Sequence, residues 1–163
     1  MPKKTLAKCP RIVLTTTLNE IKKHRPCRSG WETLTESLGK DFNPDEKIPL
    51  LTILKANGIN DVLWARRAVE NSEEKKRILK SFALDAAEHV LYLFEKKFPE
   101  DNRPRFAIEC AREFLAGTKT KQELAAAADA AYASRAAYTA YAVREKEIAW
   151  QAERLAQYLE GEL

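Results

Sequence analysis

The chain has 163 residues and a formal net charge of +4, with 45% hydrophobic and 32% charged residues. This is the composition of an ordinary globular protein, and the length suits one domain with its own core. No apolar run approaches the ~20 residues needed to cross a bilayer, and the run that begins at Ile12 is too short for a signal peptide. We therefore expect a single cytoplasmic domain, residues 1–163, without a membrane segment.

The first thirty residues carry eight Lys or Arg and a single acid, whereas acids are in excess over the rest of the chain. Such a basic stretch can meet phosphates or an acidic protein. The alternative, which we favour, is a solvated face, because no aromatic residues are interleaved as in a nucleic-acid platform. Residues 1–16 are expected to form an extended arm. The candidate partner-binding cations are Lys22, Lys23, Arg25 and Arg28.

Helix starts are predicted by Ser or Thr followed three residues later by Glu, a pair that caps a helix reciprocally. These pairs are Thr17/Glu20, Ser29/Glu32 and Thr120/Glu123. Pro26 ends the first helix, and Gly39 stands at the C-cap of the second. Two short helices, over 48–58 and 60–70, then meet at a tight turn.

A long helix is predicted from the cap at Ser72 to Phe98. Its apolar residues have helical spacing and form one seam, with a second apolar stripe beside it, so this helix should be central to the fold. The seam residues are Leu84, Ala87, Leu91, Phe94 and Phe98.

A shorter helix should begin after Asn102 and end at Gly117, followed by an alanine-rich stretch without Gly or Pro from Thr120 to about Leu159. Alanine is the best helix former, so the stretch predicts a long helix. A straight helix of this length would span ~60 Å, more than the ~40 Å diameter of a compact domain of this size. It either projects or bends or breaks near 138–143. The predicted fold is all-α, a compact multi-helix domain.

No pattern of catalytic or metal-binding residues stands out. His24 and Cys27 have an HxxC spacing but lack the second close ligand pair of a structural zinc site. Neither His24 nor His89 accompanies a nucleophile, and no phosphate loop, HExxH or EF-hand sequence occurs. We expect His89 to be a solvated or edge histidine and Glu145 and Glu147 to be exposed decoration. The prediction is a protein that is not an enzyme and holds no metal or cofactor.

Four arginines occur in conspicuous places, two beside Trp64 and two around the start of the helix after Asn102. They could form a basic patch for a partner, but we favour ion pairs between helices, because the guanidinium fork suits carboxylates. The arginines are Arg66, Arg67, Arg103 and Arg105, and the candidate carboxylates are Asp85, Glu88, Asp101 and Glu109.

Several segments occur in an order that resembles a known family. A CxxG element at Cys27–Gly30 precedes the stretch NGINDVLWARRAV at Asn57–Val69. Next in the chain come AAEHVLYLFEKKFPEDNRPR, then AIECAREFLAG, and then the alanine-rich stretch. Over Cys27–Ala142 the chain resembles the immunity-five-like group of bacterial immunity proteins, which occur in polymorphic toxin loci, phages and mobile elements.

The resemblance implies an all-helical, non-enzymatic protein that binds and neutralises a cognate toxin. Within the alanine-rich stretch, Tyr132, Tyr138 and Tyr141 stand where relatives often have tryptophan, which makes them candidate partner contacts. The alternative is that they supply bulk against the core, and we favour this for one or two of them.

Two other functions stay open at this level. A phage-type anti-defence protein that blocks a host complex would be a stoichiometric protein binder of the same kind. A nucleic-acid-binding regulator would use the basic first thirty residues, and its binding would weaken steeply with salt.

Overall fold

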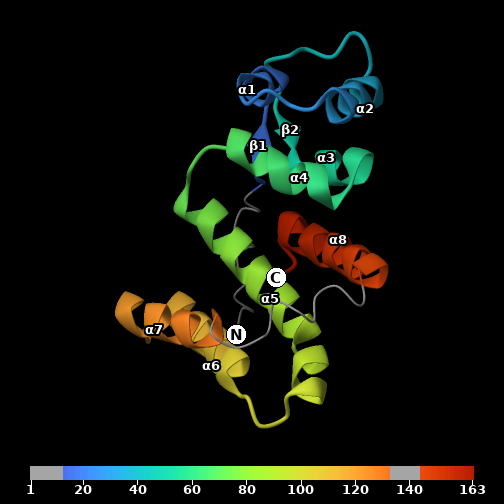
Figure 1. Ribbon diagram of the computed structural model, residues 1–163. Coiled ribbons are helices and arrows are strands. Elements are labelled where there is room, and N and C mark those ends of the chain that lie inside the picture. The colour runs from blue at the N-terminus through green and yellow to red at the C-terminus, as the bar shows by residue number, and fades with distance from the viewer. Residues whose placement is uncertain (1–12, 133–143) are drawn as a thin grey trace, which may run out of the picture. The chain divides into compact units, whose positions relative to one another are not determined.

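Helices account for nearly all regular structure of the described residues. The computed structural model describes residues 13–132 and 144–163, and side chains over 13–128 and 146–163 (Figure 1). Within these ranges there are eight α-helices, one 3-10 turn and a pair of two-residue strands. The all-α prediction is confirmed. None of the described helices is both long and apolar enough for a membrane span.

The described residues group into two compact units. The first consists of 13–70 with 156–163, and the second of 71–132 with 144–155. Each is described by itself below. The single domain expected from the length stays a prediction.

The first unit is built around a short antiparallel strand pair. Strands β1 and β2 place Thr15 opposite Pro49 and Thr16 opposite Ile48. Thr16 is buried, and its hydroxyl donates to the Ala68 carbonyl at 2.7 Å. This strand pair was not predicted, because two residues show no periodicity. The elements are β1 (Thr15–Thr16), α1 (Leu18–Lys23), α2 (Arg28–Leu38), β2 (Ile48–Pro49), α3 (Leu50–Asn57), α4 (Ile59–Ala65) and η1 (Arg66–Ala68).

The start of α2 differs from the prediction. Thr17 caps α1 as expected, accepting a hydrogen bond from the Glu20 amide at 3.1 Å. Helix α2, however, begins at Arg28 and is capped by Cys27, whose sulfur accepts from the Gly30 amide at 3.4 Å. Cys27 has the extended backbone of a cap residue, and Ser29 already lies inside the helix. The predicted Ser29/Glu32 cap is therefore wrong.

The second unit contains α5 (Glu73–Lys97), α6 (Arg103–Leu115), α7 (Lys121–Tyr132) and most of α8 (Arg144–Glu160). Ser72 caps α5 through the Lys75 amide. The capping box at α7 is complete, with the Thr120 amide 2.8 Å from a Glu123 carboxylate oxygen and the return bond at 3.3 Å. The long helix was expected to bend or break near 138–143, and these residues lie within the segment 133–143, outside the described residues.

The buried face of α5 follows a different line from the predicted seam. Leu91 and Phe94 are buried as predicted, but Ala87 is exposed and Leu84 is only half-buried. The buried residues of this helix are Ile78, Phe82, Asp85, Leu91 and Phe94. The prediction failed at this point because the buried face passes through a charged residue, Asp85, which an apolar pattern leaves out.

Asp85 is buried between two arginines from other helices. Arg112 of α6 donates to Asp85 Oδ1 at 2.9 Å, and Arg154 of α8 donates to Oδ2 at 2.7 Å. Arg112 also pairs with Glu88. Because both carboxylate oxygens are hydrogen-bonded to cations, the buried charge is compensated.

Of the four arginines singled out in the sequence, Arg103 pairs with a candidate carboxylate and the others have different partners. Arg103 binds the neighbouring Asp101, and Arg105 joins α6 to Glu95 of α5 at 2.6 Å. The hydrogen bond from Arg105 holds the pKa of the Glu95 carboxyl below its usual value. Arg66 of η1 donates to the Leu63 carbonyl of the preceding helix α4, and Arg67 lies over the Trp64 ring. Arg103 and Arg105, at the start of α6, thus form ion pairs as predicted. The predicted carboxylates Asp85 and Glu88 are instead bound by Arg112 and Arg154.

His89 also joins α5 to α8. Its Nδ1 lies 2.7 Å from Glu147 Oε2, and its ring stacks on Trp150 with centroids 3.7 Å apart. The Glu147 side chain is only 12% exposed. His89 is exposed, as expected of an edge histidine. The expectation that Glu147 is exposed decoration is wrong, since its side chain is mostly covered and takes part in this contact between helices.

We predict that Phe94→Ala lowers the free energy of unfolding by about 3–5 kcal/mol, because it removes a ring that is 2% exposed and leaves a cavity. Tyr92→Ala is the matched control, since Tyr92 lies on the same helix and is 56% exposed. Its loss should stay below about 1 kcal/mol. Urea denaturation measures both, and equal losses would place the core elsewhere.

We predict that Asp85→Asn lowers the free energy of unfolding by about 1–3 kcal/mol. Breaking a fully buried ion pair costs about 3–5 kcal/mol, but both guanidiniums here are partly exposed. Glu88→Gln is the control, because it shares Arg112 but is half exposed, and it should cost below about 1 kcal/mol. An Asp85→Asn variant as stable as the parent protein would contradict the prediction.

Candidate functional site

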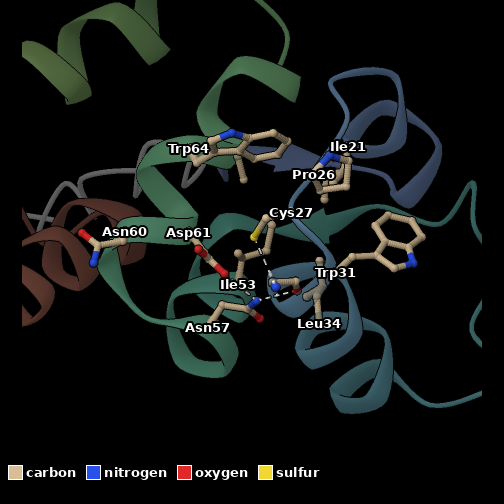
Figure 2. A pocket seen from close by; sticks show the side chains of 12 residues that line it. Ile21, Pro26, Cys27, Trp31, Leu34, Ile53, Asn57, Asn60, Asp61 and Trp64 are labelled. Atoms are coloured by element: carbon tan, nitrogen blue, oxygen red, sulfur yellow. Dashed lines mark hydrogen bonds between the residues drawn. The ribbon is translucent and has the colours of Figure 1, made fainter.

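A pocket in the first unit lies among helices α1 to α4 and has a volume of about 290 Å³ (Figure 2). Most of its walls are apolar, and its polar groups gather at one side. Its lining consists of Ile21, Pro26, Cys27, Gly30, Trp31, Leu34, Ile53, Asn57, Asn60, Asp61, Trp64 and Ala65.

Three of the lining residues form a polar clamp between α2, α3 and α4. The side-chain amide of Asn57 donates to the Gly30 carbonyl at 2.8 Å and to Asp61 Oδ2 at 2.9 Å. Asn57 Oδ1 is buried and has no hydrogen-bond partner among the described residues. A buried acceptor without a donor destabilises the folded state by about 1–3 kcal/mol. The two hydrogen bonds of the Asn57 amide and the packing around it therefore hold the side chain in place despite this cost.

Gly30 allows α4 to approach α2 closely. A Cβ atom at this position would lie 2.6 Å from Asp61 Oδ2, closer than real Cβ contacts allow, and 3.1 Å from the Cys27 sulfur, a tight contact. The Asp61 carboxylate therefore packs directly against the third residue of α2. Negative charge near a helix N-terminus is stabilised by the helix dipole, which gives Asp61 a structural role as well.

The Asp61 carboxylate has no ion pair with any Lys or Arg in the part of the chain that the structure describes. Its partner there is the Asn57 amide, through one oxygen. Around it the walls are apolar, with Leu34 and Ile53 almost fully buried. The pocket thus combines an acidic group with apolar and aromatic walls.

Trp64 borders the pocket above Asp61 and Cys27 in Figure 2, and the Trp31 indole lies at the right of the lining residues in the same view. Both tryptophans are half-buried. The guanidinium of Arg67 lies 4.9 Å from the centre of the Trp64 ring, a cation–π contact. This tryptophan therefore already accepts a guanidinium against its ring.

Comparison with known proteins relates part of the chain to a family. Residues 70–132 match the family model of the Imm-5 like putative immunity protein. The resemblance read from the sequence is confirmed over these residues, which comprise α5, α6 and α7. No curated protein and no solved structure matches the chain.

The pocket lies outside the matched residues. The Imm-5 like match begins at residue 70, whereas the CxxG element and the stretch Asn57–Val69 precede it. The structure brings these two segments together, because Cys27 and Gly30 from one and Asn57, Asp61 and Trp64 from the other line the same pocket.

The candidate cations are close in the sequence to residues that line the pocket. Lys22, Lys23, Arg25 and Arg28 are all exposed, and they surround Pro26 and Cys27 of the lining. Lys23 pairs with Glu20 and Arg28 with Glu32. Arg25 has a left-handed backbone (φ 54) at the end of α1, a conformation that reverses the chain there.

The candidate tyrosines are not placed by the structure. Tyr138 and Tyr141 lie outside the described residues, and Tyr132 ends α7 without a described side chain. Their role stays a prediction. Asn57 and Asp61 were not singled out as site residues, although their spacing of four on consecutive short helices was a usable signal. Among the described residues, no three His, Cys, Asp or Glu side chains are grouped to hold a metal.

We predict that Gly30→Ala destabilises the protein by about 1–3 kcal/mol through overpacking against Asp61 and Cys27. Glycine to alanine inside a helix normally stabilises by about 1 kcal/mol, so the sign itself is diagnostic. Ser37→Ala, an exposed site on the same helix, is the control and should be near neutral.

The close contact with Asp61 can be isolated by a double-mutant cycle. In an Asp61→Ala background the main clash is absent, so Gly30→Ala should lose most of its cost or become stabilising. Thermal unfolding of the four proteins measures the coupling. Equal effects of Gly30→Ala in both backgrounds would contradict the direct contact.

Proposed function

We propose that this protein binds a cognate toxin protein in the cytoplasm and neutralises it by stoichiometric protein–protein contact. The observation that carries the proposal is the match of residues 70–132 to an Imm-5 like immunity family. The mechanism we propose needs no catalysis, since masking a toxin surface requires only complementarity and affinity.

We further propose that the exposed cations next to pocket-lining residues in the sequence, Lys22, Lys23, Arg25 and Arg28, form part of the binding surface. Four basic side chains within seven residues favour an acidic surface on the partner and accelerate encounter at low salt. The tyrosines Tyr132, Tyr138 and Tyr141 are proposed as further contacts, because tyrosine is enriched among residues that dominate binding energy.

The test is co-purification with a tagged chain from the native host, followed by co-expression with each recovered protein. We predict a stoichiometric protein partner whose toxicity this chain suppresses. Charge reversal at the four cations should slow association and weaken binding, whereas reversal at four other exposed lysines, Lys40, Lys47, Lys80 and Lys96, should not.

Two outcomes would redirect the proposal. A captured host defence complex that is inhibited rather than a toxin would indicate an anti-defence protein. Recovery of nucleic acid alone, with binding that weakens steeply as salt rises and is lost on charge reversal, would indicate a nucleic-acid-binding regulator.

A further inference from the structure

The pocket in the first unit has the size of a site for one side chain. Its volume of about 290 Å³ lies at the lower limit of the ~300–1,000 Å³ of pockets that hold drug-sized ligands. Large interface side chains seated in such pockets carry much of the binding energy of protein complexes. The volume therefore favours a single anchoring side chain of a partner.

The Asp61 carboxylate at one side of the pocket favours a positively charged group at the end of that side chain. Asp61 pairs with no Lys or Arg among the described residues, and the Asn57 amide occupies only one of its oxygens. Asn57 is itself held by the Gly30 carbonyl, so the carboxylate is fixed in place before any partner arrives. A carboxylate within apolar walls attracts a cation, because low-dielectric surroundings strengthen the interaction.

The aromatic wall distinguishes between the two basic side chains. Guanidinium is planar, stacks on indole and gives two parallel N–H donors to a carboxylate, whereas an ammonium is a compact and strongly hydrated charge. Trp64 lines the pocket together with Asp61 and already accepts the Arg67 guanidinium at 4.9 Å. Both features suit arginine.

We infer that the pocket formed by α1 to α4 is a socket for an arginine side chain of the protein partner. This inference rests on the proposed function. Asp61 pairs with the guanidinium, Trp64 stacks on it, Ile53 and Leu34 contact its aliphatic stem, and Asn57 positions Asp61. Because Lys22 and Arg25 are exposed beside the pocket, the arginine must be flanked by acidic residues on the partner.

The test uses the full chain and three peptides, acetyl-Glu-Arg-Glu-amide and its analogues with citrulline or lysine at the centre. Citrulline has the shape of arginine without the charge. In ¹⁵N–¹H NMR titrations the arginine peptide should shift the Trp64 indole signal and bind at least tenfold more tightly than the citrulline peptide. The lysine peptide should bind at an intermediate level.

Variants assign the effect to the pocket. Asp61→Asn keeps the shape and should weaken the arginine peptide at least tenfold, whereas Glu36→Gln, an exposed acid of α2, should change nothing. Circular dichroism verifies the fold of each variant. Trp64→Leu lacks the Trp64 indole signal, so its binding is followed through the side-chain amide signals of Asn57, which also lines the pocket. This variant should weaken binding independently, which keeps the inference testable if Asp61→Asn fails to fold.

Equal binding of the arginine and citrulline peptides, or unchanged binding by Asp61→Asn, overturns the inference, as does the absence of binding. The proposed function is judged separately by toxicity suppression. If Asp61→Asn loses the peptide yet suppresses the toxin fully, the socket has no part in partner recognition while the function stands. Peptide binding without suppression of any toxin supports the socket and removes the proposed function.

Discussion

A buried carboxylate is the constraint on which the second unit depends. Asp85 receives Arg112 from α6 and Arg154 from α8, so three helices meet at one charge. Neither arginine can be lost without leaving buried charge partly uncompensated. The stacked pair of His89 and Trp150, with Glu147 beside it, adds a second polar contact between α5 and α8. These contacts fix which face of α5 is buried.

In the first unit the corresponding constraint is the absence of a side chain at Gly30. It lets the Asp61 carboxylate touch the backbone of α2, and the Asn57 amide secures both partners. The same contact leaves a fixed carboxylate, with no Lys or Arg partner among the described residues, at the side of an apolar pocket. A structural clamp and a recognition site can therefore share the same three residues.

The family match and the pocket lie in different parts of the chain. The matched residues supply α5, α6 and α7, whereas the pocket is built from α1 to α4. Proteins that bind different partners on a common scaffold need variable contact surfaces. In our proposal the matched helices supply the scaffold, and the pocket with its flanking cations contributes to the choice of partner.

The sequence by itself determined the helical class, most helix boundaries and the caps at Thr17, Ser72 and Thr120, because capping and propensity are local properties. The sequence also showed the CxxG element at Cys27–Gly30 and the stretch Asn57–Val69, but it did not indicate that the two segments meet. Only the tertiary structure decided that Asp85 is buried, that Arg112 and Arg154 are its partners, and that Gly30, Asn57 and Asp61 meet. The physical reason is that a charge can be buried, or a carboxylate can pack against a backbone, only when residues distant in the sequence supply the compensating groups. A local sequence pattern does not show which distant residues these are.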